Sequence, residues 1–113
     1  MIKRDRIELI KEMLSNNESD PFLNYAAALE YNKIGDIDKA ISLMVDLVKV
    51  SPDYLGAYYQ LGRFYEEQNE IEKAIAIFKQ GRKIAQKQKN QKTLGELSEA
   101  LMLLDDDFDG SFD

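Results

Sequence analysis

The sequence contains no cysteine and no histidine, and each absence removes a class of chemistry. Without cysteine there is neither a disulfide framework nor thiol chemistry. Without cysteine and histidine together, the usual ligand sets for zinc, haem and iron–sulfur clusters cannot be built, so we expect no metal site and no cofactor. Ser–His and Cys–His nucleophile–base pairs are excluded for the same reason. Only carboxylate, lysine or tyrosine chemistry remains open, and we do not expect an enzyme.

Long apolar runs are missing as well. The longest candidate, residues 40–50, is broken by Ser42, Asp46 and Lys49, so no segment approaches the length needed to cross a bilayer. Residues 1–6 are charged and lack an apolar core, so we expect no signal peptide and a cytoplasmic location. The net charge of −6 argues against general affinity for nucleic acid. Neither a nucleic-acid partner nor a membrane is therefore expected.

What is present is an internal repeat with a period of 34 residues. Shifting the sequence by this period pairs Tyr31 with Tyr65 and the run 39–41 with the identical run 73–75. The opposite shift pairs apolar residues of the first segment, residues 1–15, with apolar residues of positions 41–48. That segment is therefore predicted to be the second half of a repeat whose first helix is missing. The 113 residues, 44% of them apolar and 32% charged, are expected to form one ordered domain.

Capping and turn residues predict where the helices begin and end. Asp20 followed by Pro21 is typical of a helix start, and Gly35 is typical of the turn that follows a helix. We expect Asn69 and Glu72 to form a capping box for the second helix of the second repeat. The resulting segments are a half-repeat helix (1–15), a first repeat (21–54), a second repeat (55–88), a final helix (91–104) and an acidic tail (105–113).

The second repeat carries a motif that resembles the tetratricopeptide-repeat signature: Tyr58-x-x-Leu61-Gly62-x-x-Tyr65 followed by Ala74-x-x-x-Phe78. Large residues project from the first helix of the pair, and small residues lie where the second helix must approach. Gly81 stands where the family usually has a small apolar residue such as alanine. The resemblance, to small bacterial proteins of this family, implies an all-α fold. This fold is a right-handed superhelical solenoid of antiparallel helix pairs, and it serves as a protein-interaction scaffold or adaptor.

The resemblance also implies a binding surface, because the family's concave groove is lined by the first helix of each repeat. Here the corresponding stripes predict a groove that binds a peptide or helix of a partner protein. The family's best-known grooves hold a terminal carboxylate with a clamp of basic and amide side chains. This clamp is not matched here, because Arg63 is the only basic residue among the predicted groove residues. The alternative is a homodimer, formed either through this exposed helix stripe or through the C-terminal helix. The predicted groove residues are Phe22, Tyr25, Leu29, Asn32, Tyr59, Arg63 and Glu66.

The final helix does not match a repeat. Its leucines are spaced as one apolar stripe, whereas Glu96 and Glu99 face away from that stripe. A solenoid needs a terminal element with one polar face, so we expect this helix to be a cap. Docking of the helix onto a partner is the alternative. The stripe consists of Leu94, Leu97, Leu101 and Leu104.

Charge is unevenly distributed near the carboxyl terminus. Seven basic residues and no acidic one lie between Lys73 and Lys92, and five aspartates follow within the nine residues 105–113. We expect the basic run to be a solvated helix face, with an acidic-partner site or a dock for the chain's own tail as alternatives. The tail should be frayed or disordered, although Phe108 and Phe112 could form a short linear motif. Its start matches the opening of an EF-hand loop but lacks the twelfth-position glutamate, so no calcium function is expected.

Overall fold

The computed structural model describes residues 5–112, in which α-helices joined by turns are followed by an extended tail. Residues 1–4 of the expected first helix lie outside the described residues. The chain divides into two compact units, residues 5–51 and residues 52–112 among those described, and each is considered by itself. The described helices are α1 (Arg6–Asn16), α2 (Pro21–Lys33), α3 (Ile37–Val50), α4 (Leu55–Glu67), α5 (Ile71–Lys87) and α6 (Gln91–Leu104).

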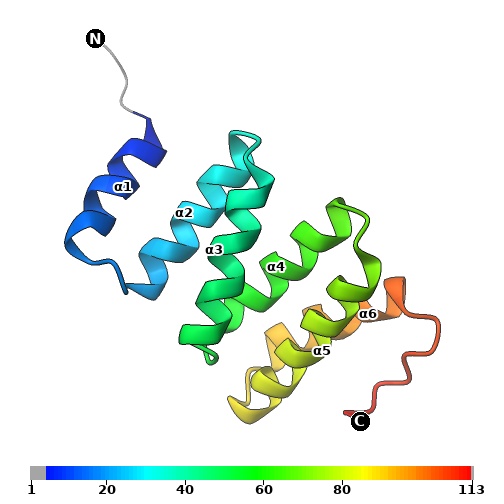
Figure 1. Cartoon of the computed structure of the whole chain (residues 1–113). Coiled ribbons are helices and arrows are strands. Elements are labelled where there is room, and N and C mark those ends of the chain that lie inside the picture. Colours follow the sequence, from blue (N-terminus) through cyan, green and yellow to red (C-terminus); the bar gives the residue numbers. More distant parts are fainter. Residues whose placement is uncertain (1–4, 113) are drawn as a thin grey trace. The chain divides into compact units, whose positions relative to one another are not determined.

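In the first unit, α2 packs against both α1 and α3, and consecutive helices run antiparallel (Figure 1). The predicted helix starts are confirmed. The Asp20 side chain accepts a hydrogen bond from the Leu23 amide at 3.1 Å, and Pro21 occupies the first turn. Asp36 caps α3 in the same way by accepting from the Lys39 amide at 3.3 Å. The buried apolar residues of this unit are Ile7, Ile10, Leu23, Ala27, Ala28, Ala40, Met44 and Leu47.

In the second unit, α5 packs between α4 and α6, and two glycines permit the close approach. A Cβ atom at Gly62 of α4 would overlap the ring of Phe78 of α5. A Cβ atom at Gly81 of α5 would lie 2.7 Å from Tyr58 Cβ and 3.0 Å from Leu97 Cδ1. Gly81 therefore replaces the expected alanine because α5 is crowded on two sides, by α4 and by α6.

Three helices end in the same hydrogen-bonded turn, in which the residue after the C-cap adopts a left-handed conformation. That residue is Gly35 after α2, Asn69 after α4 and Lys89 after α5, with φ angles of 89°, 61° and 58°. After α4 the Glu70 amide donates to the Tyr65 carbonyl at 2.8 Å. The equivalent bonds after α2 and α5, donated by the Asp36 and Asn90 amides, are both 2.9 Å long. Each of these turns therefore satisfies a backbone carbonyl that the helix end would leave unpaired.

The predicted capping box of α5 is wrong. Asn69 ends α4 instead of starting α5, because its left-handed backbone closes the turn that terminates α4. The N-cap of α5 is Glu70, whose side chain makes no capping hydrogen bond. At the start of the last helix, the Asn90 side chain accepts a hydrogen bond from the Thr93 amide at 3.0 Å.

The apolar stripe predicted for α6 is confirmed. Leu97 and Leu101 are completely buried, and Leu94 and Leu104 pack against the same core cluster. Glu96 is exposed, as expected for the opposite face. The helix therefore closes the apolar side of α5.

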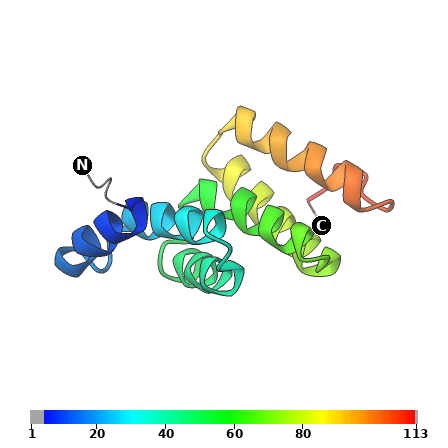
Figure 2. The ribbon, with the colours of Figure 1, turned by 90° about the horizontal axis from the view of Figure 1, so that it is seen from above.

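The tail differs from the expected disordered segment over residues 105–112. It folds back from the end of α6 (Figure 2), and Phe108 packs against the buried core cluster of this unit. The buried guanidinium of Arg82 donates hydrogen bonds to the carbonyl oxygens of Gly110 and Ser111. These contacts give the segment an ordering force that its composition does not reveal.

Two carboxylates of the tail accept hydrogen bonds from the backbone of the tail itself. Asp105 and Asp109 accept hydrogen bonds from the backbone amides of Asp107 and Ser111 at 3.0 and 2.9 Å. Over residues 5–112, no three acidic side chains are placed so that they could share a metal ion. None of the described helices combines the length and the apolar character that crossing a bilayer requires.

Candidate functional site

The four predicted groove residues of the first unit lie along α2. Phe22 in the first turn is 64% exposed, which is unusual for a phenylalanine in an ordered helix. Tyr25, Leu29 and Asn32 follow on successive turns and are partly buried. Phe22 is therefore the most accessible apolar member of the α2 stripe, by which we mean these four residues.

Phe22 borders an apolar hollow of about 160 Å³ between α1 and α2. Leu9 and Met13 of α1 contribute to its wall and are 45% and 44% exposed, and Ala26 of α2 also lines it. Leu9 and Met13 were not among the predicted site residues. The signal was available, because they are four residues apart in α1 and lie off the face that buries Ile7 and Ile10.

The α1 wall of this hollow is tied to α2 by an ion pair. Arg6 Nε lies 2.8 Å from Glu30 Oε1, and Lys33 Nζ lies 3.4 Å from the same oxygen. Only 10% of the Glu30 side chain is exposed. The hydrogen bond from Arg6 lowers the pKa of Glu30 below its ordinary value, while burial opposes this by raising it. Glu30 is thus a charged residue inside the packing face of α2, and Arg6 of α1 and Lys33 of α2 both stabilise its charged form.

The three predicted residues of the second unit lie along α4. Tyr59 is partly buried, with its ring centroid 6.1 Å from that of Phe78 and the two rings tilted by 45°. Arg63 Nε lies 3.9 Å from Glu66 Oε1 on the next turn, and these side chains are 48% and 34% exposed. The α4 stripe (Tyr59, Arg63 and Glu66) therefore offers mainly a charged pair beside an aromatic ring that the core holds in place.

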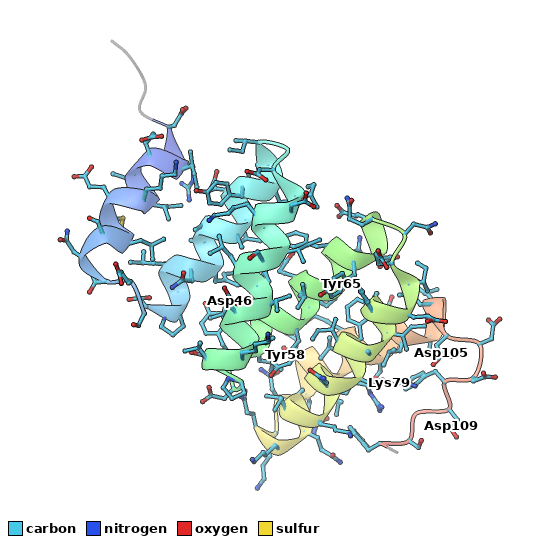
Figure 3. All side chains as sticks on the ribbon, viewed as in Figure 1. Asp46, Tyr58, Tyr65, Lys79, Asp105 and Asp109 are labelled. Atoms are coloured by element: carbon cyan, nitrogen blue, oxygen red, sulfur yellow. The ribbon has the colours of Figure 1, made fainter. Side chains whose placement is uncertain are left out.

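The tyrosines of α4 do not separate cleanly into buried core residues and exposed groove residues. Tyr58 is 4% exposed, and its hydroxyl donates to the Pro52 carbonyl at 2.5 Å. Tyr59 and Tyr65 are both partly buried and pack against the core cluster (Tyr58 and Tyr65 are labelled in Figure 3). Burial raises the pKa of Tyr58, with the nearby Asp53 charge adding to the effect. Tyr59 therefore contributes to packing as well as to the α4 stripe.

A second hollow in the first unit, of about 310 Å³, was not predicted. It lies between α3 and the segment that leads into α2, and exposed Val50 is part of its wall. Asn24 holds this segment in place, because its side-chain amide donates to the carbonyls of Glu18 and Asp20 at 2.9 and 2.8 Å. Glu18 and Asp46 line the hollow and no basic residue does, so it is better suited to a neutral or cationic group than to an anion.

The structure places the predicted residues in two sets, four along α2 and three along α4. Neither set contains two acidic residues facing each other or a nucleophile beside a base, which are the arrangements that acid–base and covalent catalysis require. What the two stripes offer are exposed apolar surface, aromatic rings and one charged pair. These are groups suited to recognition of another polypeptide.

Comparison with known proteins gives a family and a fold. A family model described as tetratricopeptide repeat matches residues 34–97. A tetratricopeptide repeat domain protein from Salinibacter ruber, solved by NMR in solution, is 37% identical over 79% of this chain and 90% of that chain, with a TM-score of 0.75. The crystal structure of a tetratricopeptide repeat domain protein from the same organism is also 37% identical, covering 79% of this chain and 99% of that chain, with a TM-score of 0.72.

A more distant likeness concerns the fold alone. The crystal structure of MamA protein is 23% identical over 88% of this chain and 55% of that chain, with a TM-score of 0.66. A search of curated proteins found no match. The helices of the structure and its likeness to these solved structures confirm the all-α repeat fold predicted from the sequence.

Proposed function

The chain belongs to the tetratricopeptide-repeat family, and from that premise we propose that it is a scaffold that binds a peptide or helix of a partner protein through the α2 and α4 stripes. Repeats of this family generally mediate protein–protein interaction. The proposal assigns the contact to Phe22, with Leu9 and Met13 beside it, and to the charged pair Arg63 and Glu66.

One observation carries this proposal: Phe22 is 64% exposed at the edge of an apolar hollow. An ordered phenylalanine in that position leaves apolar surface in contact with water, and contiguous exposed apolar surface usually marks an interaction site. A hollow of about 160 Å³ is large enough for an apolar side chain of a ligand. This ligand side chain would then contact Leu9 and Met13 of α1 and Phe22 of α2.

The α4 stripe supports specificity more than affinity. Arg63 and Glu66 are exposed enough to exchange their mutual contact at 3.9 Å for contacts with a ligand. Exposed ion pairs contribute little to stability, typically about 0–1 kcal/mol, so the exchange costs little. We expect the ligand to present polar or charged groups to this pair.

The proposal assigns no catalytic activity to the chain. Proteins of this family and fold are typically non-enzymatic scaffolds. The carboxylates of Glu66, Asp105 and Asp109 are engaged in ion pairs or backbone hydrogen bonds, so they serve binding and local structure in this interpretation.

The test is a quantitative capture experiment with matched variants. Phe22→Ser removes the exposed ring, and Ile34→Ser is the control because Ile34 is 62% exposed on the same helix's end but lies outside the stripe. A partner captured by the wild type and by Ile34→Ser, and lost with Phe22→Ser, is then purified and titrated against the Arg63→Ala variant. The proposal fails if every captured protein is retained equally by Phe22→Ser.

A second candidate function, self-association, is favoured by a different observation. Met102 and Leu103 of α6 are 68% and 81% exposed next to each other, on a surface that the apolar stripe does not use. Pairing of two α6 helices would cover them. Light scattering at increasing concentration tests this, and a dimer that Met102→Ser with Leu103→Ser abolishes would establish it.

A further inference from the structure

Arg82 of α5 is a charged residue that is only 5% exposed, and all of its hydrogen bonds stay within the second unit. Its Nε donates to the Ser98 hydroxyl of α6 at 2.9 Å. Its two terminal nitrogens donate to carbonyl oxygens of the tail, Nη1 to Ser111 at 2.7 Å and Nη2 to Gly110 at 2.8 Å. The guanidinium therefore joins α5, α6 and the tail, and it uses its fork of donors on the backbone of a peptide segment.

Two aromatic rings of the tail complete this contact. The Phe108 and Phe112 ring centroids lie 4.7 and 4.2 Å from Arg82 Cζ, which is within cation–π range. Burial lowers the pKa of Arg82 from its ordinary value, and the Asp109 charge opposes this by raising it, so the guanidinium remains charged at neutral pH. The rings and carbonyls thus replace the water that a buried cation has lost.

The tail adopts a shape that suits this contact. Gly110 has a φ angle of 88°, which glycine adopts readily and other residues rarely do. The Asp109 carboxylate accepts a hydrogen bond from the Ser111 amide at 2.9 Å and fixes the turn. At the other end, Asp105 lies 3.4 Å from Lys79 Nζ, with both residues labelled in Figure 3. Residues 108–112 therefore form a turn that points two aromatic rings and two carbonyls at one cation.

The contacts between Arg82 and the tail are of a kind that a separate peptide could also make. Two main-chain carbonyls and two aromatic rings four residues apart make up the contact with Arg82. None of these contacts requires the segment to be covalently joined to α6. A small hollow of about 60 Å³, lined by Lys79, Arg82 and Lys83 beside Phe112, also shows that the tail leaves this basic surface incompletely filled.

We propose that the α5–α6 surface around Arg82 is a second peptide-binding site, which accepts an acidic segment of a partner protein that carries two aromatic residues four positions apart. The chain's own tail occupies this site when the partner is absent. The site is independent of the α2 and α4 stripes, since it uses none of their residues. The exposed lysines Lys79 and Lys83 favour an acidic segment, as they do the tail's own aspartates.

A free peptide can occupy the Arg82 site only by displacing the chain's own tail, which is tethered next to it. A segment joined to its site by a short flexible connection competes with an effective concentration of about millimolar, so a free peptide of identical sequence binds the wild type only weakly. Loosening the tail should uncover the site. The comparison of wild type with a variant whose tail cannot dock is therefore more informative than binding to the wild type alone.

The experiment uses the full chain and a synthetic peptide with the sequence of residues 105–113, labelled with a fluorophore at its amino terminus. The protein variant Phe108→Ser with Phe112→Ser keeps the chain length and charge but removes both anchors of the resident tail. Peptide binding measured by fluorescence anisotropy should be about tenfold or more tighter for this variant than for the wild type. A peptide with serine at both phenylalanine positions is the matched control and should not bind.

Arg82→Lys, introduced into the same double variant, keeps the charge and removes the planar fork and its stacking surface. It should abolish peptide binding, while circular dichroism checks that the helices remain. Equal and negligible binding by wild type and double variant would overturn the proposal and make the tail a structural strap. Binding that Arg82→Lys leaves unchanged would overturn the assignment of the site.

A measurement on the unmutated protein covers the case in which the variants do not fold. In ¹⁵N-labelled wild type, the amides of Gly110 and Ser111 should be as ordered as those of α6, and millimolar unlabelled peptide should make them mobile. Amides that stay ordered at saturating peptide would show that the tail cannot be exchanged. Light scattering separates a second copy from a foreign partner: a dimer lost on replacing Phe108 and Phe112 would make another copy's tail the occupant, contrary to the proposal.

Discussion

At the residue scale, glycines within the helices of the second unit differ in what surrounds them. Gly62 faces the Phe78 ring, which a Cβ atom would overlap, whereas a Cβ at Gly95 of α6 would meet nothing within 4 Å. Alanine is the better helix former, by about 0.5–1 kcal/mol. The same substitution should therefore have opposite effects at the two positions.

We predict that Gly95→Ala raises the free energy of unfolding by about 0.5–1 kcal/mol. Gly62→Ala should lower it by about 1–3 kcal/mol, because the added methyl group forces the α4–α5 packing apart. Urea denaturation of the two variants measures both values. If both variants were more stable than wild type, the Phe78 ring would have room to move and the close approach at Gly62 would not limit packing.

Glu30 links stability to pH. Its pKa is lowered in the folded state by the hydrogen bond from Arg6, so its contribution to stability is present above the unfolded pKa of about 4.3 and is lost as the pH falls through the folded value. Glu30→Gln should thus be less stable than wild type at pH 7, and the difference should shrink at acidic pH. Denaturation midpoints of both proteins between pH 7 and pH 3 test this. A difference independent of pH would mean that the Glu30 charge contributes nothing.

At the element scale, the ends of α4 and α5 are closed by residues that are not glycine. Lys89 follows α5 with a φ angle of 58°, a conformation that costs a residue with a Cβ atom about 1 kcal/mol. Gln88, one residue earlier, has an ordinary right-handed conformation, with φ of −83° and ψ of −4°. Lys89→Gly should therefore stabilise the protein by up to about 1 kcal/mol, and the control Gln88→Gly should destabilise it by a similar amount. Thermal unfolding of both variants is the measurement, and equal destabilisation would contradict the prediction.

The helices themselves were predictable because their signals are local. Asp20, Pro21 and Asp36 mark helix starts by chemistry that acts within one turn, and the 34-residue repeat places the small residues of one unit by those of the other. The role of Asn69 was not predicted, since this polar residue is equally suited to start a helix and to adopt a left-handed turn. The choice depends on the backbone carbonyls that need partners, which a local pattern does not show.

The candidate site was predictable only as a set of stripe positions. Helical spacing places Phe22, Tyr25 and Leu29 on one side of α2, but the exposure of Phe22 depends on how α1 packs. Leu9 and Met13 were missed although their four-residue spacing in α1 could have indicated a shared helix face. The partial burial of Tyr59 comes from Phe78, nineteen positions away in the sequence, so spacing within α4 does not reveal it.

At the scale of the whole molecule, charge is distributed in blocks. Seven of the 15 basic residues lie between residues 73 and 92, and five of the 21 acidic residues lie in residues 105–113. Composition indicated a disordered tail, because such a segment has little apolar surface to offset its ordering entropy. That argument treats the segment by itself, whereas Arg82 contacts Gly110 and Ser111 across 28 and 29 positions of sequence.

The final prediction follows from this contact. Removal of residues 105–113 should destabilise the protein by about 1–3 kcal/mol, because it takes Phe108 from the core cluster and leaves Arg82 without two of its acceptors. For a chain of this size, the thermal midpoint should fall by several degrees. Phe22→Ala is the control, since it removes a ring of the same size that is 64% exposed, and it should change the midpoint little. An unchanged midpoint on truncation would mean that the docked tail contributes no net stability, because water then solvates Arg82 as well as the tail does.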